Sequence, residues 1–167
     1  MKIITVVGIR KSGKTSTVTA LIEAIRRRGK KVGTCKTIFC PTFSIDKSTS
    51  NTMRHRRAGS ELVCARAKGE TAFLYPEALP LSKVLESYKG CDYVLLEGDY
   101  YAPVPRIVCA HGEEDALLRM RRPSGPSPAV GKSAFSNSHL PASIIAKGIV
   151  AIVGNREAAL FYLNFLA

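Results

Sequence analysis

A short segment near the amino terminus carries the clearest chemistry in the sequence. Residues 8–15 read Gly-Ile-Arg-Lys-Ser-Gly-Lys-Thr, so that two glycines precede the pair Lys14 and Thr15. Glycines at this spacing let successive backbone N–H groups converge on a phosphate, and the lysine reaches the β and γ phosphates of a nucleotide. The hydroxyl that follows is a ligand for Mg²⁺. The segment therefore predicts a phosphate-binding loop for a nucleoside triphosphate.

The loop and the first turn after it should supply most of the nucleotide contacts, with Lys11 on the solvent side. Lys14 is the residue expected to act on the phosphates during catalysis, and Thr15 is the expected metal ligand. The full set of predicted contacts is Gly8, Arg10, Lys11, Ser12, Gly13, Lys14, Thr15 and Ser16.

An acidic residue at the end of an apolar segment is expected to complete the metal site. Residues 92–98 read Asp-Tyr-Val-Leu-Leu-Glu-Gly, which places Glu97 at the carboxyl end of a hydrophobic strand. Ligands of parallel sheets bind beyond those ends, and a buried carboxylate without a cation is costly. We therefore expect Glu97 to hold Mg²⁺ with Thr15. Asp46, in a polar loop, is either a further metal or water-positioning residue or a solvated loop acid.

The phosphate loop requires a strand before it and a helix after it, and the hydrophobic pattern predicts both. Residues 3–7 are a β-branched run, typical of a strand buried on both faces, and residues 14–28 have apolar side chains at helical spacing. A second strand over 31–36 makes a βαβ unit, whose strands must be parallel. Further along, we expect helices at 53–59, 80–88 and 157–166, and strands at 61–65, 71–75, 93–96, 106–110 and 149–153.

Strands that alternate with helices predict an α/β fold, here a P-loop NTPase-like three-layer fold with a mainly parallel sheet flanked by helices. A chain of 167 residues with 46% hydrophobic residues is expected to form one domain over 1–167, with a Pro/Ser/Gly-rich loop at about 121–141. Five cysteines without a C-x-x-C pair predict free thiols, and the absence of a long apolar run or cleavage site predicts a cytoplasmic protein without a membrane segment.

The net charge of +12 indicates an anionic partner. Arg54, Arg56 and Arg57 form one basic cluster, and arginine is suited to fork-like contacts with phosphate. We expect this cluster to bind a second anionic ligand, although a solvated helix face explains it as well. The lack of Trp and the 7% of aromatic residues argue against nucleic-acid binding.

The chain resembles the molybdopterin-guanine dinucleotide biosynthesis protein B family over about residues 3–110. Besides the phosphate loop, Lys36 matches the family's lysine at the end of the second strand, and residues 93–98 resemble its strand ending in Glu-Gly. Residues 51–60, Asn-Thr-Met-Arg-His-Arg-Arg-Ala-Gly-Ser, resemble the family's Asp-Ser-x-Arg-x-Arg-x-Ala-Gly-Ala. The chain departs from the pattern after Lys36, where Thr-Ile-Phe-Cys replaces the usual histidines, and at Asn51, where the family has an acid.

The resemblance implies a GTP-binding homodimer with weak, Mg²⁺-dependent GTPase activity. Such proteins assist the molybdopterin guanylyltransferase that attaches GMP to molybdopterin, with Lys36 and the Arg54, Arg56 and Arg57 cluster at the second ligand. GTP rather than ATP is implied by the family alone, because the sequence lacks an Asn-Lys-x-Asp guanine signature.

Two other functions fit the residues. A small-molecule kinase would use the same loop, with Asp46 or Asp99 as the base and the loop at 121–141 as a lid. A nucleotide-gated adaptor or metal-delivery protein would use hydrolysis only as a switch.

Overall fold

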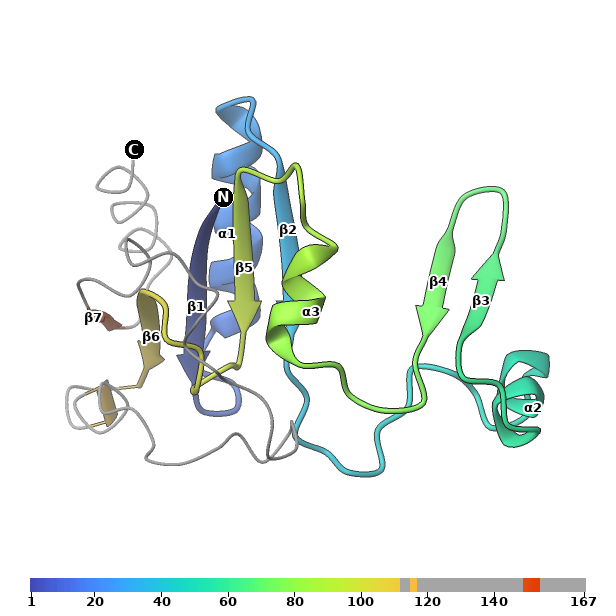
Figure 1. Ribbon diagram of the computed structural model, residues 1–167. Helices are drawn as coiled ribbons and strands as arrows, with labels where there is room; N and C mark the ends of the chain where they lie inside the picture. Colours follow the sequence, from blue (N-terminus) through green and yellow to red (C-terminus); the bar gives the residue numbers. More distant parts are fainter. Residues whose placement is uncertain (112–114, 117–148, 154–167) are drawn as a thin grey trace.

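The computed structural model describes residues 1–111, 115–116 and 149–153 (Figure 1). This part of the chain forms a five-stranded sheet in the order β2-β5-β1-β6-β7 and a two-stranded sheet of β3 and β4. The elements are β1 (Lys2–Gly8), α1 (Lys14–Arg27), β2 (Val32–Lys36), α2 (Asn51–Arg57), β3 (Val63–Arg66), β4 (Thr71–Leu74), α3 (Leu81–Glu86), β5 (Tyr93–Glu97), β6 (Arg106–Ala110) and β7 (Ile149–Val153).

The five-stranded sheet is parallel at each of its strand pairs, which confirms the predicted α/β fold. The side chains of its central strand β1 alternate between the two faces of the sheet, and they are buried on both. On one face Ile4 and Val6 pack against Leu21 of α1, and on the other Ile3 packs with Leu85 of α3. Helices therefore cover both faces, and the sheet is the middle of three layers (Figure 1).

Most element boundaries agree with the sequence prediction to within two residues. The largest shift at a helix start is in α2, which begins at Asn51 instead of residue 53. Its start is set by Ser50, whose hydroxyl oxygen accepts a hydrogen bond from the Met53 backbone N–H at 2.9 Å and so caps the helix. The strand β3 begins at Val63, where pairing with Leu74 of β4 starts, two residues later than expected. The predicted loop at 121–141 and the helix at 157–166 lie outside the described residues.

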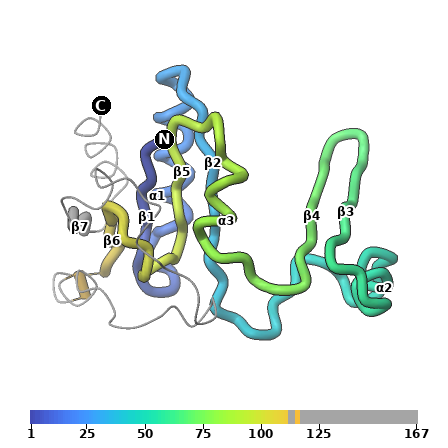
Figure 2. The backbone as a smooth tube through the Cα atoms, viewed as in Figure 1, coloured from blue at the N-terminus to red at the C-terminus, as the bar shows by residue number. Residues whose placement is uncertain are grey.

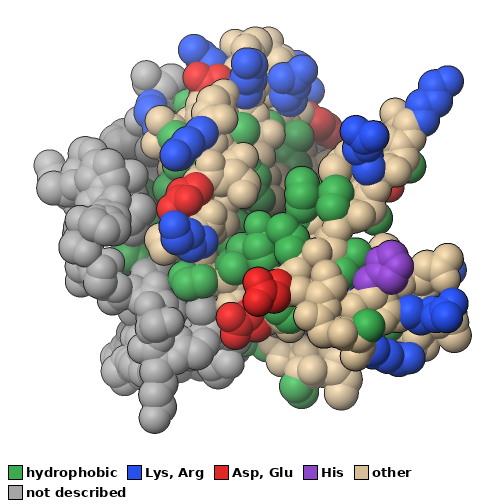
Figure 3. All heavy atoms as spheres, turned by 45° about the vertical axis from the view of Figure 1, so that its right-hand side comes forward, with side chains coloured by type: hydrophobic (Ala, Val, Ile, Leu, Met, Phe, Trp, Pro, Cys, Tyr) green, Lys and Arg blue, Asp and Glu red, His purple; other side chains and the backbone are tan. Residues whose placement is uncertain are grey.

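The hairpin of β3 and β4, together with α2, projects away from the five-stranded sheet (Figure 2). The antiparallel pairing confirms the hairpin expected from the sequence. Helix α2 has no buried residue, and Leu62, Phe73 and Tyr75 of the hairpin region are 43%, 59% and 44% exposed. Figure 3 shows hydrophobic side chains in the hollow between this projection and the rest of the described chain. The projection thus presents exposed apolar surface.

Within the described residues, none of the helices has the length and apolar character needed to cross a lipid bilayer.

Candidate functional site

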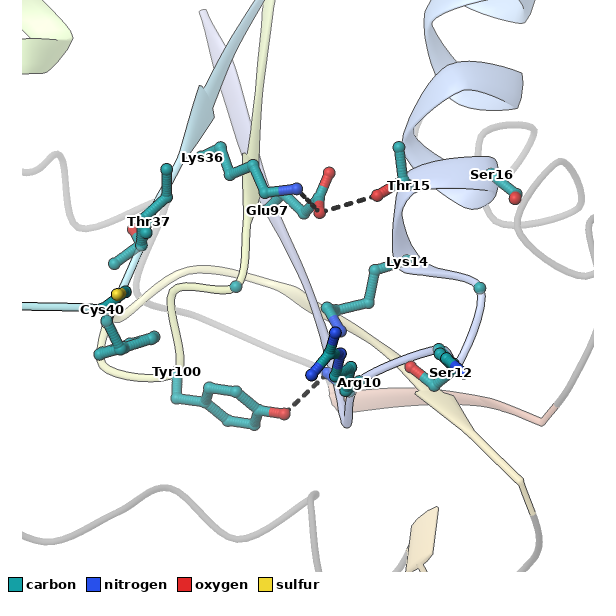
Figure 4. A pocket seen from close by; sticks show the side chains of 16 residues that line it. Arg10, Ser12, Lys14, Thr15, Ser16, Lys36, Thr37, Cys40, Glu97 and Tyr100 are labelled. Atoms are coloured by element: carbon teal, nitrogen blue, oxygen red, sulfur yellow. Dashed lines mark hydrogen bonds and ion pairs between the residues drawn. The ribbon is translucent and has the colours of Figure 1, made fainter. Parts of the chain in front are cut away.

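A cavity of about 770 Å³ lies at the carboxyl ends of β1, β2 and β5 (Figure 4). This volume is within the range of sites that hold small-molecule ligands. All eight residues predicted to contact a nucleotide line the cavity, as do Lys36 and Glu97. The remaining lining residues come from the segment after β2 and the turn after β5: Thr37, Ile38, Phe39, Cys40, Gly98 and Tyr100.

The path of the phosphate loop depends on its two glycines. A Cβ atom on Gly8 would lie 2.2 Å from the carbonyl oxygen of Cys109 and 2.4 Å from Ser12 Oγ, so no other residue fits at this position. Gly13 has a φ of 88°, in the left-handed region that glycine adopts without strain. These two positions let the chain turn tightly from β1 into α1.

The start of α1 fits an anion. The helix has no side-chain cap at its N-terminus and no acidic residue in its first turn, so no residue of that turn neutralises its positive end. Ser12 Oγ, which lines the cavity, is buried without a hydrogen-bond partner. A buried hydroxyl of this kind costs free energy unless a ligand satisfies it. A phosphate group in the loop would supply both the negative charge and the missing acceptor.

Glu97 and Thr15 meet across the cavity. The Thr15 hydroxyl donates a hydrogen bond to Glu97 Oε1 at 2.9 Å, and the ammonium of Lys36 lies 2.8 Å from the same oxygen (Figure 4). Glu97 is only 8% exposed, whereas Lys36 reaches it from the exposed end of β2. A hydroxyl and a carboxylate are oxygen ligands of the type that Mg²⁺ prefers, so this pair fits a magnesium ion.

Lys14 folds back over the phosphate loop. Its ammonium donates a hydrogen bond to the carbonyl oxygen of Ile9, which holds the charge above the loop where phosphates would lie. Arg10 and Lys11 line the same cavity and are exposed. The site is therefore strongly cationic, with Glu97 as the one carboxylate among the described residues that line it.

Tyr100 is a site residue that the sequence prediction did not include. Its hydroxyl accepts a hydrogen bond from the Gly8 backbone N–H at 2.8 Å, which ties the turn after β5 to the phosphate loop. The turn is itself fixed by Asp99, whose Oδ1 accepts backbone hydrogen bonds from Tyr101 and Ala102, each at 2.9 Å. Arg106 donates a hydrogen bond to the Tyr100 carbonyl oxygen. Asp99, of a residue type that often accepts backbone hydrogen bonds in turns, was the available sequence signal.

Asp46 and the arginine cluster lie elsewhere. Asp46 does not line the cavity but lies beside the start of α2, where the hydroxyl of Ser50, and then that of Thr52, lower the pKa of its carboxyl by hydrogen bonding. Arg56 donates to the Pro76 carbonyl oxygen at 3.3 Å, and Arg54 and Arg57 are exposed. Of these predicted site residues, Lys36 lines the cavity of its own chain, whereas Asp46 and the three arginines do not.

The wall of the cavity formed by residues 37–40 is partly apolar. Ile38 and Phe39 are 38% and 45% exposed, at the positions where the sequence departs from the family's histidines. Cys40 is exposed, and hydrogen bonding by the Thr42 hydroxyl lowers the pKa of its thiol. All five cysteines are free thiols, as expected from the sequence. No cluster of three or more His, Cys, Asp or Glu residues that could hold a metal occurs among the described residues.

A glycine-rich loop between a central parallel strand and its helix, facing an acidic residue at the end of the neighbouring strand, defines a P-loop α/β protein. The model of the family described as molybdopterin guanine dinucleotide synthesis protein B matches residues 3–123. The chain belongs to this family, which takes part in the synthesis of molybdopterin guanine dinucleotide.

Solved structures of similar proteins agree with this fold. MobB from Bacillus subtilis is 20% identical, with a TM-score of 0.63 over 98% of this chain and 97% of that one. A MobB homologue from Bacillus stearothermophilus is 21% identical, with a TM-score of 0.61 over 99% of this chain and 95% of that one. A molybdopterin-guanine biosynthesis protein B is 21% identical, with a TM-score of 0.61 over 98% of each chain. No curated protein sequence matches the chain. At these identities the structural likeness shows a shared fold.

Proposed function

We propose that this chain binds GTP with Mg²⁺ at the cavity, hydrolyses it slowly, and assists the guanylyltransferase that attaches GMP to molybdopterin. The observation that carries the proposal is the 2.9 Å contact between Thr15 Oγ1 and Glu97 Oε1 beside the glycine loop. It places a hydroxyl and a buried carboxylate together where a metal ion on the β and γ phosphates of a nucleotide would lie.

Each residue of the cavity has a distinct role in this proposal. Lys14 and the loop N–H groups hold the β and γ phosphates, and the Ser12 hydroxyl donates to one of their oxygens. Thr15 and Glu97 hold Mg²⁺, which when bound neutralises the charge that develops on the phosphates. Arg10 and Lys11, exposed at the mouth, attract the anionic nucleotide.

Slow hydrolysis follows from what lines the cavity. The described lining residues include no glutamine to orient a water molecule, and the one carboxylate among them, Glu97, is engaged by Thr15 and Lys36. Fast hydrolysis in P-loop proteins needs a group that orients the attacking water. The preference for GTP over ATP rests on family membership, because a guanine nucleotide forms part of the family's product.

We also propose that the chain acts as a homodimer that uses the projecting hairpin. Leu62, Phe73 and Tyr75 expose apolar surface there, and contiguous apolar surface of this kind marks sites of protein association. Arg54 and Arg57 are exposed on α2 of the same projection, and Figure 3 shows basic side chains over this region. In the dimer, these arginines and Arg56 are proposed to contact the phosphate of molybdopterin.

Calorimetric titration tests the nucleotide site. Mg²⁺·GTP and Mg²⁺·ATP are titrated into the wild-type chain and into Lys14→Ala, each with and without molybdopterin. We expect GTP to bind more tightly than ATP and the variant to lose both. Lys30→Ala is the matched control, because Lys30 is exposed and lies after the far end of α1. Normal GTP affinity in Lys14→Ala would overturn the proposal.

The structure does not support a small-molecule kinase, because neither of its two candidate bases, Asp46 and Asp99, is placed to act at the cavity. Asp46 lies beside α2, and Asp99 is 7% exposed with Oδ1 engaged by two backbone N–H groups. Neither residue lines the cavity. Nothing in the described part of the chain favours phosphate transfer to a small molecule or metal delivery over the proposed function.

A further inference from the structure

The pairing of Lys36 with Glu97 is built into the sheet. The two residues are direct partners in the register of β2 and β5, so their side chains emerge on the same face of the sheet. Lys36 Nζ lies 2.8 Å from Glu97 Oε1, and this is the oxygen that also accepts the Thr15 hydroxyl. A lysine ammonium therefore occupies the carboxylate oxygen that faces the proposed metal position.

The two partners differ sharply in their freedom to move. The Lys36 side chain is 58% exposed, whereas that of Glu97 is 11% exposed. A lysine has a flexible four-carbon stem, so its ammonium can leave for another anion nearby without a change in the backbone. Glu97 cannot leave, because it is part of a strand that is buried along its whole length.

An ammonium 2.8 Å from this oxygen opposes a magnesium ion at the same place. Mg²⁺ requires short contacts to oxygen ligands in a near-ideal octahedron, and a positive charge within 3–4 Å repels it strongly. The repulsion is greater here because Lys14, Arg10 and Lys11 line the same cavity. Free Mg²⁺ would therefore have to displace the Lys36 ammonium from Glu97. The described lining residues offer this ammonium no other carboxylate.

A nucleoside triphosphate changes this balance. Its phosphates bring several negative charges into the cavity, and they give the displaced ammonium a new partner. We propose that Lys36 is an internal counter-ion that excludes free Mg²⁺ from Glu97 and Thr15, and that it moves to the terminal phosphate when the metal arrives with a nucleotide. This inference rests on the proposed function, because it assumes that Thr15 and Glu97 are the metal ligands.

Manganese binding without nucleotide tests the first half of this inference. Mn²⁺ is titrated alone into the full chain and the free ion is followed by electron paramagnetic resonance. Lys36→Met removes the ammonium and should tighten Mn²⁺ binding by about tenfold or more, because one repelling charge beside the ligand oxygen is lost. Lys36→Arg keeps the charge and should bind Mn²⁺ as weakly as wild type.

Three controls locate the effect. Lys83→Met removes a lysine that pairs with Glu86 at 3.2 Å on α3, and it should leave Mn²⁺ affinity unchanged. In the double variant Lys36→Met/Glu97→Gln the gain should disappear, because the ligand oxygen has lost its charge. Circular dichroism checks that each variant is folded, and Lys36→Gln replaces Lys36→Met if the latter does not fold. Unchanged or weaker Mn²⁺ binding in folded Lys36→Met would overturn the inference.

The second half is tested by comparing GTP with GDP in the presence of Mg²⁺. If Lys36 moves to the terminal phosphate, Lys36→Met should lose most of the preference for GTP over GDP, while Lys83→Met keeps it. An unchanged preference would overturn the move to the phosphate. The Mn²⁺ titration contains no nucleotide, so its result does not depend on GTP binding. If Lys36→Met binds Mn²⁺ more tightly but the wild-type chain binds no GTP, the proposed function is refuted and the counter-ion role of Lys36 is kept.

Discussion

The hydroxyl of Tyr100 accepts a hydrogen bond from the backbone N–H of Gly8 at 2.8 Å, although the two residues are 92 positions apart. Tyr100 belongs to the turn after β5, and Glu97 is the last residue of that strand. The contact therefore holds the phosphate loop and the strand of the acidic residue in a fixed relation. Positioning of this kind matters for a metal site, where ligand atoms must be held within fractions of an ångström.

Removing the Tyr100 hydroxyl tests this positioning role. Tyr100→Phe should lower the free energy of unfolding by about 0.5–1.5 kcal/mol, the usual worth of one hydrogen bond, and should weaken Mg²⁺·GTP binding several-fold. Tyr75→Phe is a suitable control because Tyr75 is exposed. Urea denaturation measures the stability and calorimetry the affinity. A variant with wild-type affinity would show that the loop does not depend on this contact.

Gly8 should not tolerate a side chain. Gly8→Ala would place its Cβ 2.2 Å from the Cys109 carbonyl oxygen, so backbone must shift. We expect a loss of about 1–3 kcal/mol in stability, typical of overpacking, together with loss of nucleotide binding. Gly69→Ala is the matched control, since a Cβ there has nothing within 4 Å and no positive φ. Equal thermal stability of the two variants would contradict the close approach.

The thiol of Cys40 should react first among the five cysteines. Hydrogen bonding by Thr42 lowers the pKa of Cys40, whereas burial raises the pKa of Cys35 and of Cys109. A lowered pKa leaves more thiolate at neutral pH, and thiolate is the reactive form. Alkylation by iodoacetamide, followed by mass spectrometry against pH, should therefore modify Cys40 below the pH at which an ordinary thiol reacts.

Thr42→Val provides the control for this prediction. It removes the hydroxyl whose hydrogen bond with the sulfur lowers the pKa of Cys40, so this pKa should rise towards its ordinary value. The pH profile of alkylation should then move to higher pH. A profile that stays in place would rule out the hydrogen bond as the cause.

A charge on the hairpin should separate the proposed dimer. Phe73→Asp introduces a carboxylate on the exposed apolar face of β4, where Phe73 is 59% exposed. The folded monomer tolerates an exposed charge, but an apolar interface does not, so light scattering after gel filtration should change from dimer to monomer. Thr71→Asp, at an exposed position of the same strand, tests for a general effect of charge. A wild-type chain that is already monomeric would refute the dimer.

Substituting the arginines of α2 should separate two binding functions. The double variant Arg54→Ala/Arg57→Ala changes exposed residues that do not line the cavity, so affinity for Mg²⁺·GTP should stay within about twofold. Binding of molybdopterin should weaken markedly if these side chains contact its phosphate. Equal loss of both affinities would place the arginines at the nucleotide site of the assembled protein.

Local patterns were sufficient to predict much of the fold, and in the site they predicted the phosphate loop and Glu97. The β-branched run of β1, the helical spacing in α1 and the glycines between them are contiguous, so their structure follows from nearest neighbours. Glu97 was also predictable, because it ends an apolar run. The hairpin followed from turn residues at Lys68 and Gly69, although β3 begins two residues later than expected.

Contacts between distant segments were not predictable in the same way. The pairing of Lys36 with Glu97 requires that β5 lies beside β2, which is a property of strand order and not of either strand's sequence. The sequence leaves two roles open for Asp46, a metal or water-positioning residue and a solvated loop acid, because it follows β2 in a polar loop. The segment after residue 40 instead leads away to α2, where hydroxyls of Ser50 and Thr52 engage it.

The strand order β2-β5-β1 has a consequence for the time at which the site forms. The phosphate loop is made early in synthesis, but β1 and β2 are not neighbours in the sheet, because β5 lies between them. Until β5 joins the sheet both strands have unpaired edges, and forming the long-range parallel pairs is slow because a long loop must close first. A nascent chain that ends before residue 97 therefore carries a complete glycine loop with no acidic partner. The proposed metal pair of Thr15 and Glu97 is therefore complete only after β5 has taken its place between β2 and β1.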